Sequence, residues 1–99
     1  MIVVRNVFHL KFGKAREALN LIKEGIAIQK RAGSTFSPRV LTDLTGPFYT
    51  VVLELTAPSY SAFEAEAPQL MANKEWQANY QKLVPLVKWG SREIFTIVE

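Results

Sequence analysis

Three side chains are the candidates for acid–base or anion-binding chemistry: His9, Arg5 and Glu54. His9 is the only histidine, and it could act as a general base because imidazole exchanges protons near neutral pH. It could equally be a histidine near a strand end that is hydrogen-bonded to the backbone or to water. The chain has no cysteine and no second histidine, so no residue spacing predicts a metal site.

Arg5 and Glu54 are also candidates as a pair. Their side chains would point from the same face of a sheet if the strands that carry them are adjacent and antiparallel. In the functional interpretation, Arg5 anchors an anionic substrate and Glu54 orients that substrate or acts as the base. In the alternative, the two form an ion pair at a dimer interface or at the rim of a pocket.

Polar and aromatic side chains supply the candidates for ligand binding. Asn6 could donate or accept a hydrogen bond with a substrate oxygen, or it could hold a neighbouring loop. Trp76 and Tyr80 recur at helical spacing and could be core aromatics or the wall of a pocket for a flat ligand. Trp89 could lie at a subunit boundary, where large aromatic residues are enriched.

Length and composition indicate one ordinary globular domain over residues 1–99. Hydrophobic residues make up 48% of the chain and charged residues 21%. No apolar run approaches the roughly 20 residues that span a bilayer, and the first residues lack the features of a signal peptide, so we expect a cytoplasmic protein. The net charge is +3, but basic and acidic residues alternate along one predicted helix. This pattern is typical of a solvated helix face and does not predict nucleic-acid binding.

Hydrophobic periodicity predicts four strands and two helical regions. The strands cover residues 1–11, 39–44, 48–56 and 92–99, and the helical regions cover 14–31 and 59–85. Gly33 should end the first helix, and Gly25 inside it hints at close packing against the sheet.

The second helical region contains several signals for helix ends. Ser61 to Glu64 matches a capping box, and Ser59 is a competing N-cap. Pro68 should interrupt the helix, Asn73 should cap its continuation, and Pro85 should lie near its end. Gly90 and Ser91 are expected to connect this helix to the last strand.

The order strand, helix, strand, strand, helix, strand predicts an α+β, ferredoxin-like βαββαβ sandwich with a four-stranded antiparallel sheet. Two helices can cover only one face of such a sheet. The open face is then expected to mix apolar and polar side chains, and such a face usually marks an interface. We therefore expect a homodimer. The side chains expected on that face are Val3, Arg5, Val7, His9, Phe48, Thr50, Val52 and Glu54.

Three segments resemble a known family. Phe8 to Lys14, ahead of an amphipathic helix, resembles the opening of the dimeric α/β-barrel superfamily. Asn73 to Gln77 and Leu83 to Val87, ahead of a final strand, look more narrowly like its NIPSNAP-like members. The resemblance implies two ferredoxin-like half-barrels that close on each other and leave each subunit a pocket. Members of the superfamily include cofactor-free antibiotic-biosynthesis monooxygenases, haem-degrading monooxygenases and lactone isomerases.

The haem-degrading branch does not fit this chain. That branch uses an asparagine on the first strand and a tryptophan in the second helical region, and Asn6 and Trp76 occupy comparable positions. It also uses a histidine about ten residues after the tryptophan, and residues 77–88 contain none. His9 lies on the first predicted strand and cannot replace that ligand. We therefore expect no haem and no other tightly bound cofactor.

These observations lead to one main functional hypothesis and an alternative. The resemblance implies a NIPSNAP-like protein that acts as a cofactor-independent monooxygenase or isomerase on a small aromatic or polyketide-like compound. In that hypothesis His9 or Glu54 moves a proton, Arg5 and Asn6 bind the ligand, and Trp76 and Tyr80 form its walls. The alternative is a non-catalytic small-molecule-binding or dimerisation module.

Overall fold

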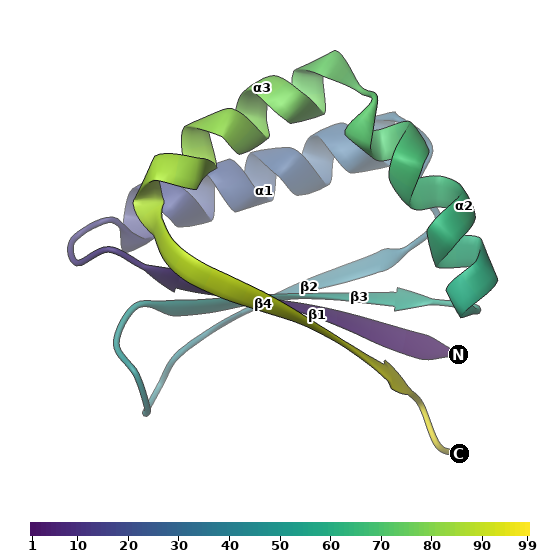
Figure 1. Ribbon diagram of the computed structural model, residues 1–99, viewed down its shortest axis with the longest axis horizontal. Coiled ribbons are helices and arrows are strands. Elements are labelled where there is room, and N and C mark those ends of the chain that lie inside the picture. Colours follow the sequence, from purple (N-terminus) through teal and green to yellow (C-terminus); the bar gives the residue numbers. More distant parts are fainter.

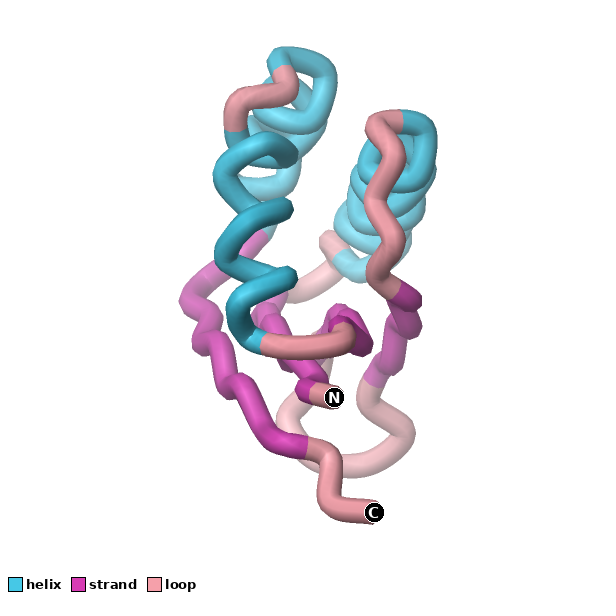
Figure 2. Tube along the Cα trace, turned by 90° about the vertical axis from the view of Figure 1, so that its right-hand side faces the viewer, coloured by secondary structure: helices cyan, strands magenta, loops and turns pink.

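The computed structural model describes residues 1–99 and confirms the predicted α+β, ferredoxin-like architecture. Its sheet has four antiparallel strands in the order β2-β3-β1-β4. All helices lie over one face of this sheet, and the other face is open (Figures 1 and 2). In chain order the elements are β1 (Ile2–Leu10), α1 (Ala15–Arg31), β2 (Ser37–Thr42), β3 (Thr50–Ala57), α2 (Tyr60–Met71), α3 (Lys74–Leu83), the short 3-10 helix η1 (Val84–Leu86) and β4 (Val87–Thr96).

The hydrophobic core lies between the sheet and the helices, and it forms two separate clusters. Side chains alternate along β1, so every second residue can face the helices. The first cluster contains Ile2, Val4, Phe36, Leu55, Ala57 and Phe63. The second cluster contains Leu10, Ala18, Ile22, Val51, Leu83 and Leu86.

Helix α1 has the predicted C-terminus but a different neighbour at its glycine. Gly33 follows the cap residue Ala32 and has φ of +94°, a conformation that favours glycine. The prediction that Gly25 packs against the sheet is wrong. A Cβ atom at Gly25 would lie 3.3 Å from the side-chain nitrogen of Asn79 on α3, and that nitrogen donates to the Leu21 carbonyl over 2.8 Å. Gly25 therefore permits close contact between the two helices.

The second helical region is divided later than predicted. The side chain of Ser59 caps α2 by accepting from the Ala62 amide over 3.1 Å, so Ser61 is not the cap. Ser59 has the extended backbone that an N-cap needs, whereas Ser61 is already helical. Pro68 lies inside α2 instead of interrupting it. Pro68 and Glu64, whose carbonyl loses its helical partner, are both exposed, so water can bind that carbonyl. As predicted, Asn73 caps α3.

Strand β4 begins at Val87, five residues earlier than the predicted last strand, and it contains Gly90 and Ser91. The pairing shifts between His9 and Leu10 because β4 carries one extra residue, Lys88. Strand β3 begins at Thr50, so Phe48 lies in the preceding loop and not on the open face. Tyr49 explains this difference: its φ of +61° breaks the alternation that the sequence pattern assumes.

Candidate functional site

Four charged residues cross the open face of the sheet in one row. Paired residues of neighbouring antiparallel strands share a face, and the registers connect Arg39 to Glu54, Glu54 to Arg5, and Arg5 to Glu93. The signs alternate along this charged row, from β2 to β4. The predicted pairing of Arg5 with Glu54 is thus part of a longer arrangement.

Glu54 lies between two arginines. Its Oε2 is 3.2 Å from Arg5 Nε, and its Oε1 accepts from Arg39 over 2.6 Å and 3.2 Å. The Glu54 side chain is only 13% exposed, so both of its oxygens are engaged within the protein. Arg5 Nε is buried, and its contact with Glu54 is not aligned as a hydrogen bond, so this donor lacks an acceptor.

His9 lies on the same face, and the apolar pair of Val7 and Val52 separates it from the charged row. Its ring stacks on Trp89 with 4.0 Å between the ring centroids and 20° between the planes. The Thr50 hydroxyl donates its only proton to the Pro47 carbonyl over 2.9 Å, so the 3.4 Å contact with His9 Nδ1 requires that Nδ1 donates. Nε2 is then the nitrogen that can accept a proton.

Asn6, Trp76 and Tyr80 lie on the helix side and not with the residues of the open face. Asn6 Oδ1 accepts from Arg92 Nε over 2.7 Å, and the Arg92 guanidinium lies 5.7 Å from the centre of the Phe63 ring. On α3, Trp76 and Tyr80 stack with 5.1 Å between their ring centroids. The sheet separates these groups from Arg5, His9 and Glu54, so the predicted residues form two sets that cannot contact one small molecule.

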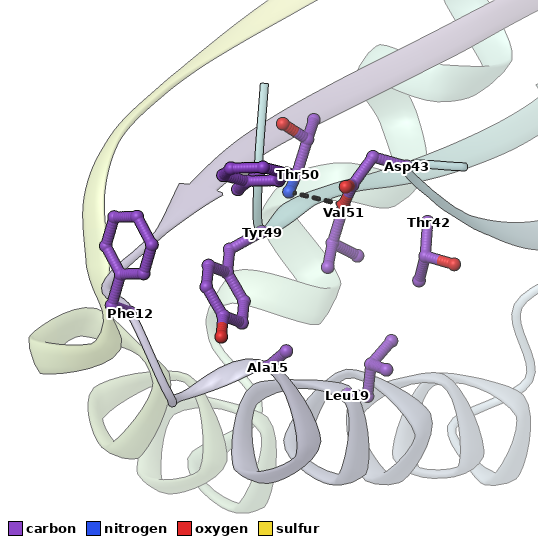
Figure 3. Close-up of a pocket in the computed structure, with 9 residues that line it drawn as sticks. Phe12, Ala15, Leu19, Thr42, Asp43, Tyr49, Thr50 and Val51 are labelled. Atoms are coloured by element: carbon purple, nitrogen blue, oxygen red, sulfur yellow. Dashed lines mark hydrogen bonds between the residues drawn. The ribbon is translucent and has the colours of Figure 1, made fainter. Parts of the chain in front are cut away.

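A groove opens between the start of α1 and the β2–β3 connection (Figure 3). Its volume is about 500 Å³, and six of its nine lining residues are hydrophobic. They are Phe12, Ala15, Leu19, Thr42, Asp43, Phe48, Tyr49, Thr50 and Val51.

Tyr49 has an unusual backbone in the wall of this groove. It is the only residue other than glycine with positive φ. A bulky residue in the left-handed region costs on the order of 1–3 kcal/mol and persists only where its surroundings hold it. The Tyr49 carbonyl accepts from the Leu10 amide over 2.9 Å, and its ring meets Phe12 edge-on at 5.0 Å.

Several solved structures match this fold over nearly the whole length of the chain. No protein-family model and no curated protein matched the chain. A NIPSNAP domain protein from Burkholderia xenovorans has a TM-score of 0.88 and 23% identity, over 99% of this chain and 95% of that one. A NIPSNAP family protein from Agrobacterium tumefaciens has a TM-score of 0.87 and 24% identity, over 99% and 93% of the two chains. The chain has a NIPSNAP-like fold.

An antibiotic biosynthesis monooxygenase shares this NIPSNAP-like fold at a greater distance. Its TM-score is 0.77 at 14% identity, and the match covers 100% of both chains. Identities in this range establish the fold alone.

None of the helices is long and apolar enough to cross a membrane, and no three His, Asp or Glu side chains gather as a metal site would require.

Sequence reasoning missed several residues that complete these sites in the NIPSNAP-like fold. Arg39 and Arg92 were not candidates because each meets its partner through strand register, which the sequence does not specify. Phe12 and Tyr49 flank the groove. The aromatic residues in the β1–α1 and β2–β3 connections could have indicated a binding site from the sequence. Apolar aromatic residues in loops are otherwise expected to avoid water.

Proposed function

We propose that this protein works as a homodimer that binds a small molecule, with the two open sheet faces packed against each other. The alternating charged row supports this arrangement. When the row is turned around a two-fold axis that runs along the strands, every arginine meets a glutamate of the second copy. An interface related by such an axis must be complementary to itself, and this row meets that condition.

The order of the charged row determines which residues of the two copies would face each other across the interface. Arg39 would face Glu93 of the second copy, and Glu54 would face Arg5. The Arg5 side chain is 35% exposed, so the accessible part of its guanidinium would then lie near a second carboxylate.

Apolar residues on both sides of the charged row also support the dimer. Val7 and Val52 pair directly on one side, and Leu41 pairs with Val52 on the next strand. On the other side Val3 pairs with Phe95, which is 46% exposed. Covering this surface would stabilise association by about 25 cal/mol per Å² of apolar area, before the entropy of association is subtracted.

Small-molecule binding is supported by the Asn6–Arg92 pair between the sheet and the helices. The hydrogen bond from Arg92 to Asn6 and the contact with Phe63 hold the guanidinium in place. A held guanidinium beside an aromatic ring can bind a carbonyl or phenolate oxygen of an aromatic compound. This is the binding role we assign to the helix side of the sheet.

Glu93→Arg tests the dimer by sedimentation velocity. Glu93 makes no ion pair within its own chain, whereas the substitution would place two arginines face to face twice in the dimer. We expect the wild type to sediment as a dimer at micromolar concentration and the variant's dissociation constant to rise at least about tenfold.

Glu64→Arg on α2 is the matched control, because it makes the same charge change on an exposed residue of the helix layer. It should leave the dissociation constant unchanged. A wild-type protein that stays monomeric at tens of micromolar, or equal effects of the two substitutions, would contradict the dimer.

A cofactor-independent monooxygenase or isomerase is the second candidate function. The fold likeness to an antibiotic biosynthesis monooxygenase favours it, together with the free Nε2 of His9. Because Glu54 is engaged by two arginines, His9 is the better base, with Arg5 as the group that holds an oxyanion. The substrate would have to be easily oxidised, since the oxygenase would use no cofactor.

Oxygen uptake with a hydroxyanthrone, an easily oxidised aromatic compound, tests the monooxygenase activity. We expect His9→Ala to lower the rate by about 10²-fold while binding is retained, because a general base contributes at least that much. Arg5→Ala should weaken both binding and turnover. Unchanged rates in both variants would remove these residue assignments.

A further inference from the structure

The groove between α1 and the β2–β3 connection is separate from the charged row and from the Asn6–Arg92 pair (Figure 3). We propose that it binds a flat aromatic molecule of one or two rings that carries an uncharged hydrogen-bond donor. Its volume of about 500 Å³ lies in the range of small-molecule sites. The groove lies beside α1 and contains none of the charged row, so this proposal does not rest on the dimer.

The mouth of the groove is aromatic and exposed. Phe12 is 67% exposed and Phe48 is 75% exposed, although both have large apolar rings. The Phe12 ring meets Tyr49 and Phe48 edge-on, at 5.0 Å and 6.4 Å between centroids. A flat ring that enters here would contact aromatic surfaces that otherwise face water, and aromatic pairs favour such offset or edge-on arrangements.

Below the mouth, the walls of the groove are mostly apolar. Ala15 and Leu19 come from one side of α1, and Val51 comes from β3 (Figure 3). These side chains offer only apolar surface, which a planar hydrocarbon ring can cover. A sugar or a phosphate would leave most of its polar groups without partners there, although Thr42, Thr50 and the Tyr49 hydroxyl also line the groove.

Asp43 supplies the polar contact that fixes the orientation of a ligand. Its Oδ1 accepts from the Thr50 amide over 2.9 Å, which holds the carboxylate in place. Its Oδ2 has no hydrogen-bond partner within the chain and can accept one from a ligand. Lys88 is outside the lining of the groove but lies 5.2 Å from the centre of the Phe12 ring, and its positive charge offsets the attraction of the Asp43 carboxylate for a cation. This offset favours a neutral N–H or O–H donor.

Tyr49 gives an independent reason to assign a function to this groove. Its left-handed backbone is unfavourable for an aromatic residue, and such conformations concentrate at ligand clamps. Asparagine or glycine would adopt the same φ with less strain. The tyrosine ring forms a wall between the aromatic mouth and the apolar floor (Figure 3).

Indole and 1-methylindole are the probes, and binding is measured by titration with two-dimensional NMR. The two molecules have nearly the same shape, but only indole has an N–H donor. We expect indole to bind about tenfold more tightly, as one hydrogen bond to a charged acceptor allows. Shifted amides should cluster at residues 12–19 and 42–51. Equal affinities, or shifts elsewhere, would overturn the proposal.

Asp43→Asn and Tyr49→Asn separate the two parts of the site. Asp43→Asn keeps an acceptor for the Thr50 amide but presents an NH₂ group to the ligand, so indole should fall to the affinity of 1-methylindole. Tyr49→Asn should weaken both probes at least about fivefold, while the melting temperature changes little because relief of the strained backbone offsets the lost packing of the ring against the second core cluster. A lower melting temperature with unchanged affinity would assign Tyr49 a merely structural role and overturn its place in the site.

Two further variants distinguish the groove from the rest of the protein surface. Tyr60→Ala removes a tyrosine that is 51% exposed on α2, outside the groove, and it should leave indole affinity unchanged. Phe48→Ala should weaken indole binding and leave the sedimentation coefficient unchanged. If Phe48→Ala instead lowers self-association and leaves indole binding intact, the mouth belongs to a protein contact and the proposal fails.

Discussion

At Gly90 the backbone of β4 lies so close to the backbone of β1 that there is no room for a side chain. A Cβ atom at this position would lie 2.8 Å from the Val7 carbonyl oxygen, which belongs to the backbone of a central strand and cannot turn away. We expect Gly90→Ala to lower the free energy of unfolding by about 1–3 kcal/mol, as overpacking does. Urea denaturation measures this difference.

Ser91→Ala, measured with Gly90→Ala at a concentration where the protein is monomeric, is the matched control, because it changes the next residue of the same strand by only a hydroxyl group. It should change the free energy of unfolding by less than about 0.5 kcal/mol. Equal unfolding midpoints for the two variants would show that β4 can move away from β1 at this point.

Residue by residue, the sequence predicted those contacts that follow from alternation and strand order. Arg5 and Glu54 had matching faces on strands that the topology makes adjacent, so their ion pair could be anticipated. The pairing of Asn6 with Arg92 depends on the register of β4, which no local pattern specifies. Tyr49 could not be anticipated, because nothing in a tyrosine indicates positive φ.

Among the elements, the helix boundaries show which local signals decide a structure. Ser59 and Ser61 both carry a hydroxyl suited to an N-cap, and only the backbone conformation distinguishes them. Asn73 was predictable because the chain needs a new start after α2 and offers one suitable residue. Pro68 was overestimated as a helix breaker, since one lost hydrogen bond on an exposed face is tolerated.

In strand β4 the pairing with a neighbouring strand decides the structure, and the local sequence signals are misleading. Gly90 and Ser91 resemble a loop when they are viewed alone, but β1 needs a partner along its whole length. The absence of a side chain at Gly90 is what allows this close pairing. A glycine inside a strand often marks such an approach of two backbones, so the same residue can be mistaken for a turn.

At the scale of the whole molecule, the fold followed from the order of its elements. Amphipathic helices that can cover only one sheet face leave the ferredoxin-like sandwich with an open face, which Figure 2 shows below the helix layer. The self-complementary order of the charged row could not be read from the sequence, because Arg39 and Glu93 join it only through the registers of the two edge strands.

The division of the core into two clusters predicts how substitutions combine. Ile2 and Ile22 belong to different clusters, so Ile2→Val and Ile22→Val should each cost about 0.5–1.5 kcal/mol and add within about 0.5 kcal/mol in the double variant. Ile22→Val with Val51→Ala, inside one cluster, should depart further from additivity. Urea denaturation at one protein concentration measures all five variants. A large coupling between Ile2 and Ile22 would mean that the sheet transmits strain between the clusters, and the core would then act as one unit.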